Sequence, residues 1–312
     1  MLQDSAPRWF TDAMSFPLQQ RTLTVGDCPL NYLVWGDLAK PPIVLVHGGA
    51  AHAMWWSALA PQLSRHYYVI APDLSGHGDS GRRETYSLEG WAGEVMAVSQ
   101  DAGCAGPPVL VGHSMGGLVS IVAAAMHGDQ LAGAVMVDSP VRRPDPESNE
   151  GERGKAFRNP KTYPDLDAAL VHFRVIPEQP CANDFIVNHI ARHSVRQTDA
   201  GWTWKFDPKV FLRFPPKSLH NYLASVRCRV ALLRGELSAI VPPETGEYMY
   251  ELLNRNAPLV EIPQAYHHLI LDQPLAFIAA LRALLADWEH SVPRRRVDVS
   301  GKLNGGPSAG PN

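Results

Sequence analysis

Residues 109–117 read Val-Leu-Val-Gly-His-Ser-Met-Gly-Gly, and this stretch decides the fold. Apolar strand formers lead into it, Ser114 stands between two glycines at its centre, and small apolar residues at 118–126 follow it. This order predicts a strand, a sharp turn and a helix, because glycine lacks the Cβ atom that would clash where the backbone bends tightly. Such a turn exposes the Ser114 hydroxyl above a sheet and aims the Met115 amide at whatever the hydroxyl attacks. The stretch therefore predicts a nucleophilic serine.

The composition limits the class of protein. The chain has 312 residues, of which 45% are hydrophobic, so it can bury a substantial core in one large domain or two small ones. The formal net charge of -3 gives no basic surface for nucleic acid or for an anionic membrane. We expect a small-molecule substrate as the partner, while the composition leaves a monomer and a homodimer equally open.

The cysteines and the N-terminal residues bear on location. The four cysteines lie far apart without the spacing of metal ligands, which is typical of free thiols in a reduced compartment. Residues 1–16 contain no apolar run long enough for a signal peptide or a membrane span. Both observations favour a cytoplasmic location. The cysteines are Cys28, Cys104, Cys181 and Cys228.

Short buried strands alternate with helices along most of the chain. Polar and apolar residues alternate on both sides of Gly26-Asp27, which predicts a β-hairpin, and continuous apolar runs later in the chain predict strands covered on both faces. We therefore expect an α/β fold with a doubly wound, mostly parallel, eight-stranded sheet and right-handed crossovers. The expected strands are 21–25, 30–35, 43–46, 67–71, 109–113, 131–137, 229–235 and 259–262, and the expected helices include 54–63, one that begins after Ser87, 242–253 and 274–288.

The composition changes at Ser139. From there to residue 225 the chain is rich in Pro, Arg, Asn and His, with scattered aromatic residues and no clean buried strand. This predicts a mainly helical cap inserted over the carboxyl edge of the sheet. The expected units are an N-terminal arm at 1–19, a core at 20–138 and 226–290, a cap at 139–225 and a disordered tail rich in Gly, Pro and Ser at 291–312.

Several motifs now stand in a recognisable order. The serine turn, His47-Gly48-Gly49 after one strand and Pro72-Asp73-Leu74 followed by Gly76 and Gly78 after the next resemble the α/β-hydrolase superfamily. The resemblance extends from about residue 20 to residue 288. It implies that the turn after the third strand supplies a second amide for an oxyanion hole. That amide is Gly49 here, with Ala50 as the alternative, beside Met115.

The resemblance also implies a catalytic base after the last strand. Residues 262–274 are similar to the family's histidine loop, in which the histidine stands five residues before an acid, and counting back from Asp272 gives His267. An imidazole suits this role because its pKa lies near neutrality. Tyr266 stands where the family usually has glycine. We expect the neighbouring His268 to point the other way and to pack or cap.

The acid of the expected triad has two candidates. Family members commonly place an aspartate shortly after the strand that corresponds to 230–233, but Ala239 stands there in this chain. Some relatives instead carry the acid at the end of the strand after the nucleophile helix, where this chain has Asp138. A carboxylate is needed to hold the histidine tautomer and to stabilise its cation. We expect Asp138 to be the acid, with Glu236 as the alternative.

The remaining candidate residues concern metal binding, cofactor binding and the substrate pocket. Asp73, His77 and Asp79 have the side chains of metal ligands, but the glycines between them favour a structural loop, and we expect no metal. No Gly-rich nucleotide loop follows a strand, so we expect no cofactor. Four tryptophans are candidates for a substrate pocket, although each could equally be core. They are Trp55, Trp56, Trp202 and Trp204.

The expected chemistry is acyl transfer to water. A serine nucleophile disfavours the branch of the family that uses aspartate, and the first hypothesis is a carboxylesterase or lactonase acting on a small apolar ester. A carbon-carbon bond hydrolase of a ring-derived diketone is the alternative, and its pocket would need cationic anchors. A noncatalytic ligand-binding protein on the same scaffold and a lyase that uses the same serine also remain open.

Overall fold

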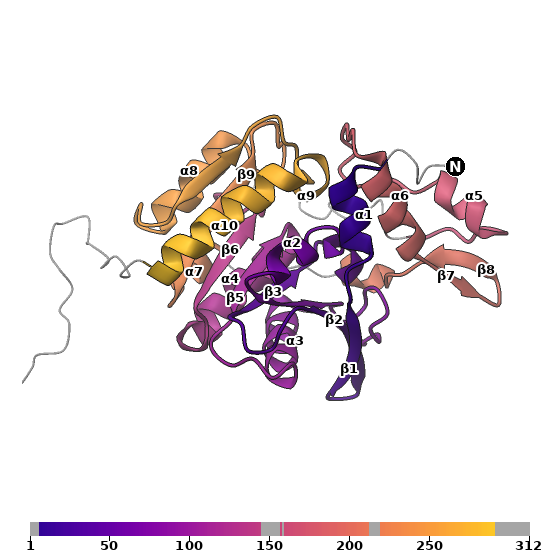
Figure 1. The fold of residues 1–312 in the computed structure, drawn as a ribbon, viewed down its shortest axis with the longest axis horizontal. Helices are drawn as coiled ribbons and strands as arrows, with labels where there is room; N and C mark the ends of the chain where they lie inside the picture. The colour runs from indigo at the N-terminus through magenta and orange to yellow at the C-terminus, as the bar shows by residue number, and fades with distance from the viewer. Residues whose placement is uncertain (1–5, 145–156, 158, 212–218, 291–312) are drawn as a thin grey trace, which may run out of the picture.

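The central feature of the fold is one eight-stranded sheet (Figure 1). The computed structural model describes residues 6–144, 157, 159–211 and 219–290. The strands lie in the order β1-β2-β4-β3-β5-β6-β9-β10, and only β2 runs antiparallel to its neighbours. The predicted fold class is therefore confirmed. The strands are β1 (Gln19–Val25), β2 (Cys28–Trp35), β3 (Pro42–Val46), β4 (Tyr68–Pro72), β5 (Val109–His113), β6 (Gly133–Val137), β9 (Arg229–Gly235) and β10 (Leu259–Ile262).

Two hydrophobic cores lie on the two faces of this sheet. Successive residues of a strand point to opposite faces, and β3 divides accordingly, with Val44 and Val46 in one core and Ile43 and Leu45 in the other. The first core is covered by α3 (Leu88–Asp101), α4 (Met115–His127), α7 (Leu219–Ala224) and α8 (Pro243–Leu252). The second is covered by α1 (Arg8–Met14), α2 (Ala60–Ser64), α9 (Leu269–Asp272) and α10 (Pro274–His290).

The helix boundaries follow local chemistry. The Ser87 hydroxyl accepts a hydrogen bond from the Gly90 amide at 3.0 Å and so caps α3, as the sequence predicts. The single helix expected at 54–63 is instead two pieces, the 3-10 helix η1 (Ala53–Trp56) and α2. Pro61 explains the break, because proline has no amide hydrogen and is tolerated only in the first turn of a helix.

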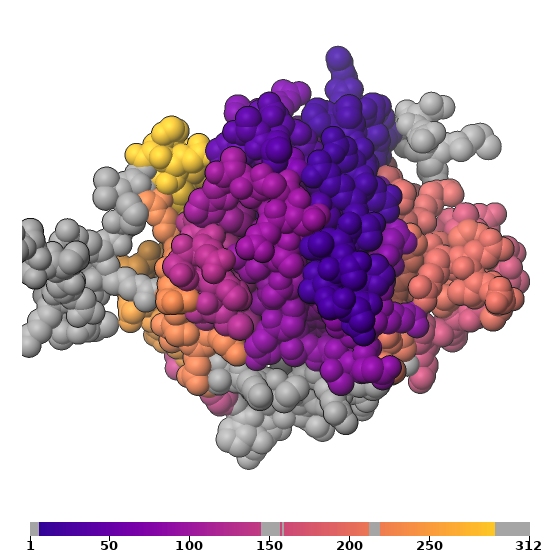
Figure 2. Space-filling model, turned by 90° about the horizontal axis from the view of Figure 1, so that it is seen from below, coloured from indigo at the N-terminus to yellow at the C-terminus, as the bar shows by residue number. Residues whose placement is uncertain are grey.

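The segment between β6 and β9 contains both helices and strands. Its described part holds α5 (Leu166–Val171), α6 (Asp184–His193), the 3-10 helix η5 (Pro208–Phe211) and α7. It also holds a hairpin of β7 (Val195–Thr198) and β8 (Gly201–Trp204), which the sequence does not predict. Figure 2 shows that most of this segment lies at the end of the molecule opposite α10. The tail at 291–312, expected to be disordered, lies outside the described residues, and no helix in the described ranges is long and apolar enough to cross a membrane.

Candidate active site

The strained turn at Ser114 joins β5 to α4. Ser114 has φ 54° and ψ -121°, a backbone conformation that residues with a side chain rarely adopt. A Cβ atom on Gly112 would overlap the Gly116 carbonyl, and one on Gly116 would overlap the Val46 carbonyl of β3. Glycine is therefore required at both positions by the close approach of the backbone. The turn leaves Ser114 half-buried at the carboxyl end of the sheet.

His267 lies between Ser114 and Asp138. Its Nε2 atom is 3.1 Å from Ser114 Oγ, and its Nδ1 atom is 2.7 Å from Asp138 Oδ2. An ionised carboxylate only accepts hydrogen bonds, so Nδ1 carries the proton and the lone pair of Nε2 faces the serine hydroxyl. His267 and Asp138 are both buried. The structure thus brings together three side chains that are far apart in the sequence.

The Asp138 carboxylate is held from several directions. Asp138 follows β6 with φ 48°, and its Oδ1 atom accepts a hydrogen bond from the Gly235 amide at 2.9 Å. Its Oδ2 atom also accepts a hydrogen bond from the Ser238 hydroxyl at 2.5 Å. Ser238 comes from the loop after β9, in which family members commonly carry their acid. The sequence analysis did not single out Ser238, because nothing in the local sequence indicates what its hydroxyl contacts.

Glu236, the alternative acid, has a different partner. Its side chain is exposed, and Oε2 accepts a hydrogen bond from the Gln264 amide at 2.7 Å. Gln264 has φ 55° and lies in the loop that leads to His267. Glu236 therefore braces the start of this loop, whereas Asp138 accepts the hydrogen bond from the His267 imidazole.

The turn after β3 lies beside the serine turn. Among the described residues, neither the Gly49 amide nor the Met115 amide donates a hydrogen bond, so both can donate to an oxyanion. Ala50, the alternative donor, has φ 56°. His47 fixes this turn, because its Nδ1 donates to the Gly48 carbonyl at 2.7 Å while its Nε2 accepts from the Leu74 amide at 3.1 Å. Burial lowers the pKa of His47 to about 4, so its ring is neutral at pH 7.

The loop after β4 is organised around Asp73. Its carboxylate accepts hydrogen bonds from the Ala53 amide at 2.6 Å, the Asp79 amide at 2.9 Å and the Asn31 side chain at 2.8 Å. Burial raises the pKa of Asp73 to about 6 despite these bonds. His77 Nδ1 lies 3.2 Å from the Ser75 carbonyl in the same loop. These side chains contact the loop's own backbone and its neighbours.

The histidine loop is tied down by the segment between β6 and β9. The Asp272 carboxylate accepts hydrogen bonds from the Tyr266 amide at 2.8 Å and from the Gln179 side chain at 2.9 Å. Gln179 also accepts from the His268 amide at 2.7 Å, and burial raises the pKa of Asp272 to about 6. Tyr266 is not among the residues with positive φ, so a side chain is tolerated where the family usually has glycine. Sequence analysis missed Gln179 because it lies in the inserted segment.

The four candidate pocket tryptophans have different surroundings. Trp56 is fully buried and packs against Phe277 of α10, whereas Trp55 lies beside His268, with ring centroids 5.6 Å apart. Trp202 and Trp204 are on β8. The Trp204 ring contacts Tyr163 and Phe173, and the backbone of Trp202 pairs with that of Tyr163.

Three phenylalanines lie at or near the predicted oxyanion turn. A Cβ atom built on Gly49 would lie 3.1 Å from the Phe211 ring and 3.7 Å from Met115 Sδ. Phe157 stacks on Phe211 at a centroid distance of 4.5 Å, and Phe206 meets both rings edge-on. Sequence analysis did not assign these aromatic residues to the site, because no spacing links them to the serine turn.

Comparison with known proteins identifies the class. Residues 43–281 match the model of the alpha/beta hydrolase family, so the chain belongs to that family. It is 27% identical over 265 residues to "Esterase Rv0045c" of Mycobacterium tuberculosis, covering 82% of this chain and 86% of the relative. It is 26% identical over 263 residues to the pimeloyl-(acyl-carrier protein) methyl ester esterase of Neisseria meningitidis, covering 78% of this chain and 93% of the relative.

Solved structures share the fold. The crystal structure of E-2-(acetamidomethylene)succinate hydrolase has a TM-score of 0.76 at 23% identity, covering 86% of this chain and 100% of the other. A thioesterase domain from the curacin biosynthetic pathway has a TM-score of 0.71 at 22% identity, covering 86% of this chain and 99% of that domain. At such identities the likeness concerns the fold alone. Together with its distant esterase relatives, the family places the chain among the hydrolases.

Proposed function

We propose that this protein is a serine carboxylesterase that cleaves a small apolar ester or lactone through an acyl-enzyme. The observation that carries the proposal is the line of two hydrogen bonds from Ser114 through His267 to Asp138. A serine hydroxyl is a weak nucleophile at neutral pH and needs an adjacent base, which a third group must orient. The distant relatives named as esterases support the same reaction class.

The proposed reaction begins when Ser114 Oγ attacks the ester carbonyl while His267 Nε2 removes the hydroxyl proton. The amides of Met115 and Gly49 stabilise the resulting oxyanion, and Asp138 stabilises the imidazolium. The protonated His267 then gives its proton to the leaving alcohol. Water, activated by the same imidazole, cleaves the acyl-enzyme and frees the serine.

The surroundings of the proposed oxyanion turn favour an apolar substrate. Phe211 and Met115 both lie beside Gly49, and Phe157 and Phe206 extend this aromatic surface. Such a surface suits an acyl chain or a ring better than a charged group. A diketone hydrolase would need cationic anchors. Arg143 instead pairs with Glu251 at 2.8 Å, and Arg174 donates to the Phe173 and Val171 carbonyls.

The test is hydrolysis of p-nitrophenyl esters from acetate to a long acyl chain. We expect the wild type to turn them over, with the chain-length optimum reporting the size of the pocket, and Ser114→Ala to lose activity by about a millionfold. Ser225→Ala is the matched control, because this exposed serine donates to the Tyr222 and Asn221 carbonyls, away from the serine turn. Absence of turnover for the whole series, or activity retained by Ser114→Ala, would overturn the proposal.

A further inference from the structure

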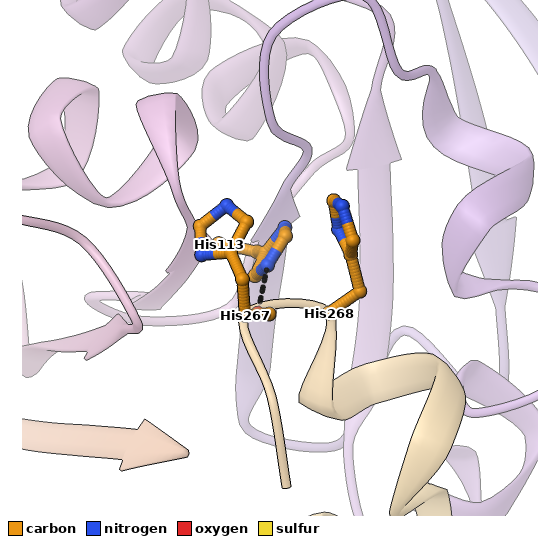
Figure 3. A group of neighbouring side chains, drawn as sticks. All are labelled: His113, His267 and His268. Carbon is orange, nitrogen blue, oxygen red and sulfur yellow. Dashed lines mark hydrogen bonds between the residues drawn. The ribbon is translucent and has the colours of Figure 1, made fainter. Parts of the chain in front are cut away.

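Three buried histidine rings lie side by side (Figure 3). One of them, His267, contacts Ser114 through its Nε2 atom. His113 ends β5, and His267 and His268 are adjacent in the loop that leads to α9. The ring centroids are 5.0 Å apart for His113 and His267, 5.5 Å for His113 and His268, and 4.8 Å for the adjacent pair. Each ring contributes one nitrogen atom to a group of three that all lie within 4.8 Å of one another. His268 therefore does not point away from His267, contrary to the expectation from the sequence.

The tautomer of His113 follows from its one hydrogen bond. Its Nε2 atom is 2.9 Å from the His267 carbonyl, and a carbonyl can only accept, so Nε2 carries the proton. The lone pair is then on Nδ1, which is buried and has no hydrogen-bond partner among the described residues. Burial lowers the pKa of His113 to about 3, which keeps the ring neutral at pH 7. An unsatisfied buried lone pair is costly unless something occupies it.

His268 presents a second unsatisfied imidazole. In the described ranges, neither of its ring nitrogens has a hydrogen bond of normal length, although the Pro177 and Ile176 carbonyls lie close enough to influence its pKa. Burial holds that pKa well below its ordinary value, so this ring is also neutral. Its neighbours are Trp55 and the two other rings of the cluster.

We propose that His113, His267 and His268 form a binding site for a divalent transition-metal ion such as Zn²⁺ or Cu²⁺. Neutral imidazole nitrogens are the preferred ligands of these ions. Such an ion would coordinate His267 Nε2 in place of the hydrogen bond to Ser114, and the site is therefore inhibitory. The effect on activity rests on the function proposed above, whereas binding of the ion does not.

The outer contacts of the cluster resemble those of metal sites. Metal-bound histidines donate their second ring N–H to a carboxylate or a carbonyl, which fixes the ring and increases its basicity. His267 has Asp138 in this position, at 2.7 Å, and His113 has the His267 carbonyl. Two histidine nitrogens on a tetrahedral zinc ion lie about 3.4 Å apart, so nitrogens that lie within 4.8 Å of one another have to close by at most about 1.4 Å. The ion can enter along the substrate's route, because Ser114 is half-buried rather than enclosed.

The first test measures binding without reference to catalysis. Chelator-treated protein is titrated with Co²⁺, whose visible absorption reports coordination. We expect one equivalent to bind to the wild type and equally to Ser114→Ala, and affinity to fall at least about tenfold in His268→Phe. His189→Phe is the matched control, because this half-buried histidine bonds to Ser57 outside the cluster. Absence of Co²⁺ binding, or unchanged affinity in His268→Phe, would overturn the proposal.

The second test measures inhibition. Zn²⁺ should abolish ester hydrolysis by the wild type, and EDTA should restore it. Half-inhibition of His268→Phe, measured relative to its own rate without metal, should need at least about tenfold more zinc. Equal zinc sensitivity of the two proteins would contradict the proposal. Should His268→Phe not fold, Cu²⁺ bound to the wild type must still show coupling to three nitrogens in its electron paramagnetic resonance spectrum, and coupling to only one would reject the site. Metal binding by a protein that hydrolyses no ester would overturn the esterase proposal alone.

Discussion

Asp138 and Glu236 make the sharpest contrast at the scale of single residues. Asp138 is buried, bonds to His267 and is oriented by Gly235 and Ser238, whereas Glu236 is exposed and bonds to a backbone amide. If Asp138 holds the tautomer of His267, replacing its carboxylate by an amide offers the imidazole the wrong partner. Each of the two loops offers one carboxylate, and only the hydrogen-bond partners of the two side chains distinguish Asp138 from Glu236.

We therefore expect Asp138→Asn to lower kcat by about 10⁴-fold with little change in KM. Steady-state hydrolysis of a p-nitrophenyl ester measures this. Glu236→Gln is the paired variant, and it should stay within about threefold of the wild type. A loss of less than tenfold in Asp138→Asn, combined with a large loss in Glu236→Gln, would move the role to Glu236.

Residues of the candidate site differ in how far the sequence could predict them. Ser114 and His267 were predicted because each occupies a fixed place in a motif at the end of a strand. In the structure, Ser114 Oγ and His267 Nε2 are 3.1 Å apart. Ser238 and Gln179 were not predicted, since their hydrogen bonds join segments 100 and 89 residues apart, and local spacing does not report such contacts. The histidine cluster was missed for the same reason.

At the scale of elements, the packing of the serine turn depends on the absence of side chains. A Cβ atom at Gly116 would overlap the Val46 and His47 carbonyls, so α4 could no longer approach β3. Gly93 on α3 offers a contrast, because it is exposed and a Cβ atom there would meet nothing within 4 Å. Both glycines lie inside helices, where alanine is otherwise the better helix former.

We expect Gly116→Ala to lower the free energy of unfolding by more than about 2 kcal/mol, because backbone has to move to accommodate the new atom. Gly93→Ala should raise it by about 0.5 to 1 kcal/mol through helix propensity alone. Urea unfolding of both variants measures the difference. Equal effects of the two substitutions would show that the close approach at Gly116 does not constrain the turn.

The elements of the central sheet were predicted more completely than those of the inserted segment. Continuous apolar runs identify strands that are covered on both faces, and all eight strands of the sheet correspond to such runs or to the alternating hairpin. The β7–β8 hairpin was missed because its strands are four residues each and not deeply buried, so they carry little hydrophobic pattern. The assignment of 139–225 as a separate cap stays a prediction.

At the scale of the whole molecule, buried neutral histidines dominate the response to acid. Burial lowers the pKa of His47 to about 4 and that of His113 to about 3, and it holds the pKa values of three further histidines well below 6.5. The unfolded chain therefore binds more protons than the folded chain as pH falls through 6.5. Asp73 and Asp272, whose pKa values are raised from 3.8 to about 6, act in the opposite direction. The three further histidines are His52, His77 and His268.

We expect the free energy of unfolding to fall by several kcal/mol between pH 7.5 and pH 5.5, since each buried histidine contributes up to about 1.4 kcal/mol per pH unit below 6.5. The five histidines outweigh the two carboxyl groups. Urea unfolding in chelator-containing buffer measures this, and the control is the interval from pH 7.5 to 8.5, where these histidines are neutral in both states. Equal or greater stability at pH 5.5 would contradict the assignment of neutral buried rings.

The measurement that most directly tests the account is labelling of the protein with a fluorophosphonate, followed by mass spectrometry of the digested peptides. An activated serine beside an oxyanion hole reacts with this reagent, whereas an ordinary serine does not. We expect a single adduct on Ser114, its absence in Ser114→Ala, and far slower labelling in His267→Ala. No adduct on the wild type, or an adduct on another serine, would contradict the central claim that Ser114 is the nucleophile.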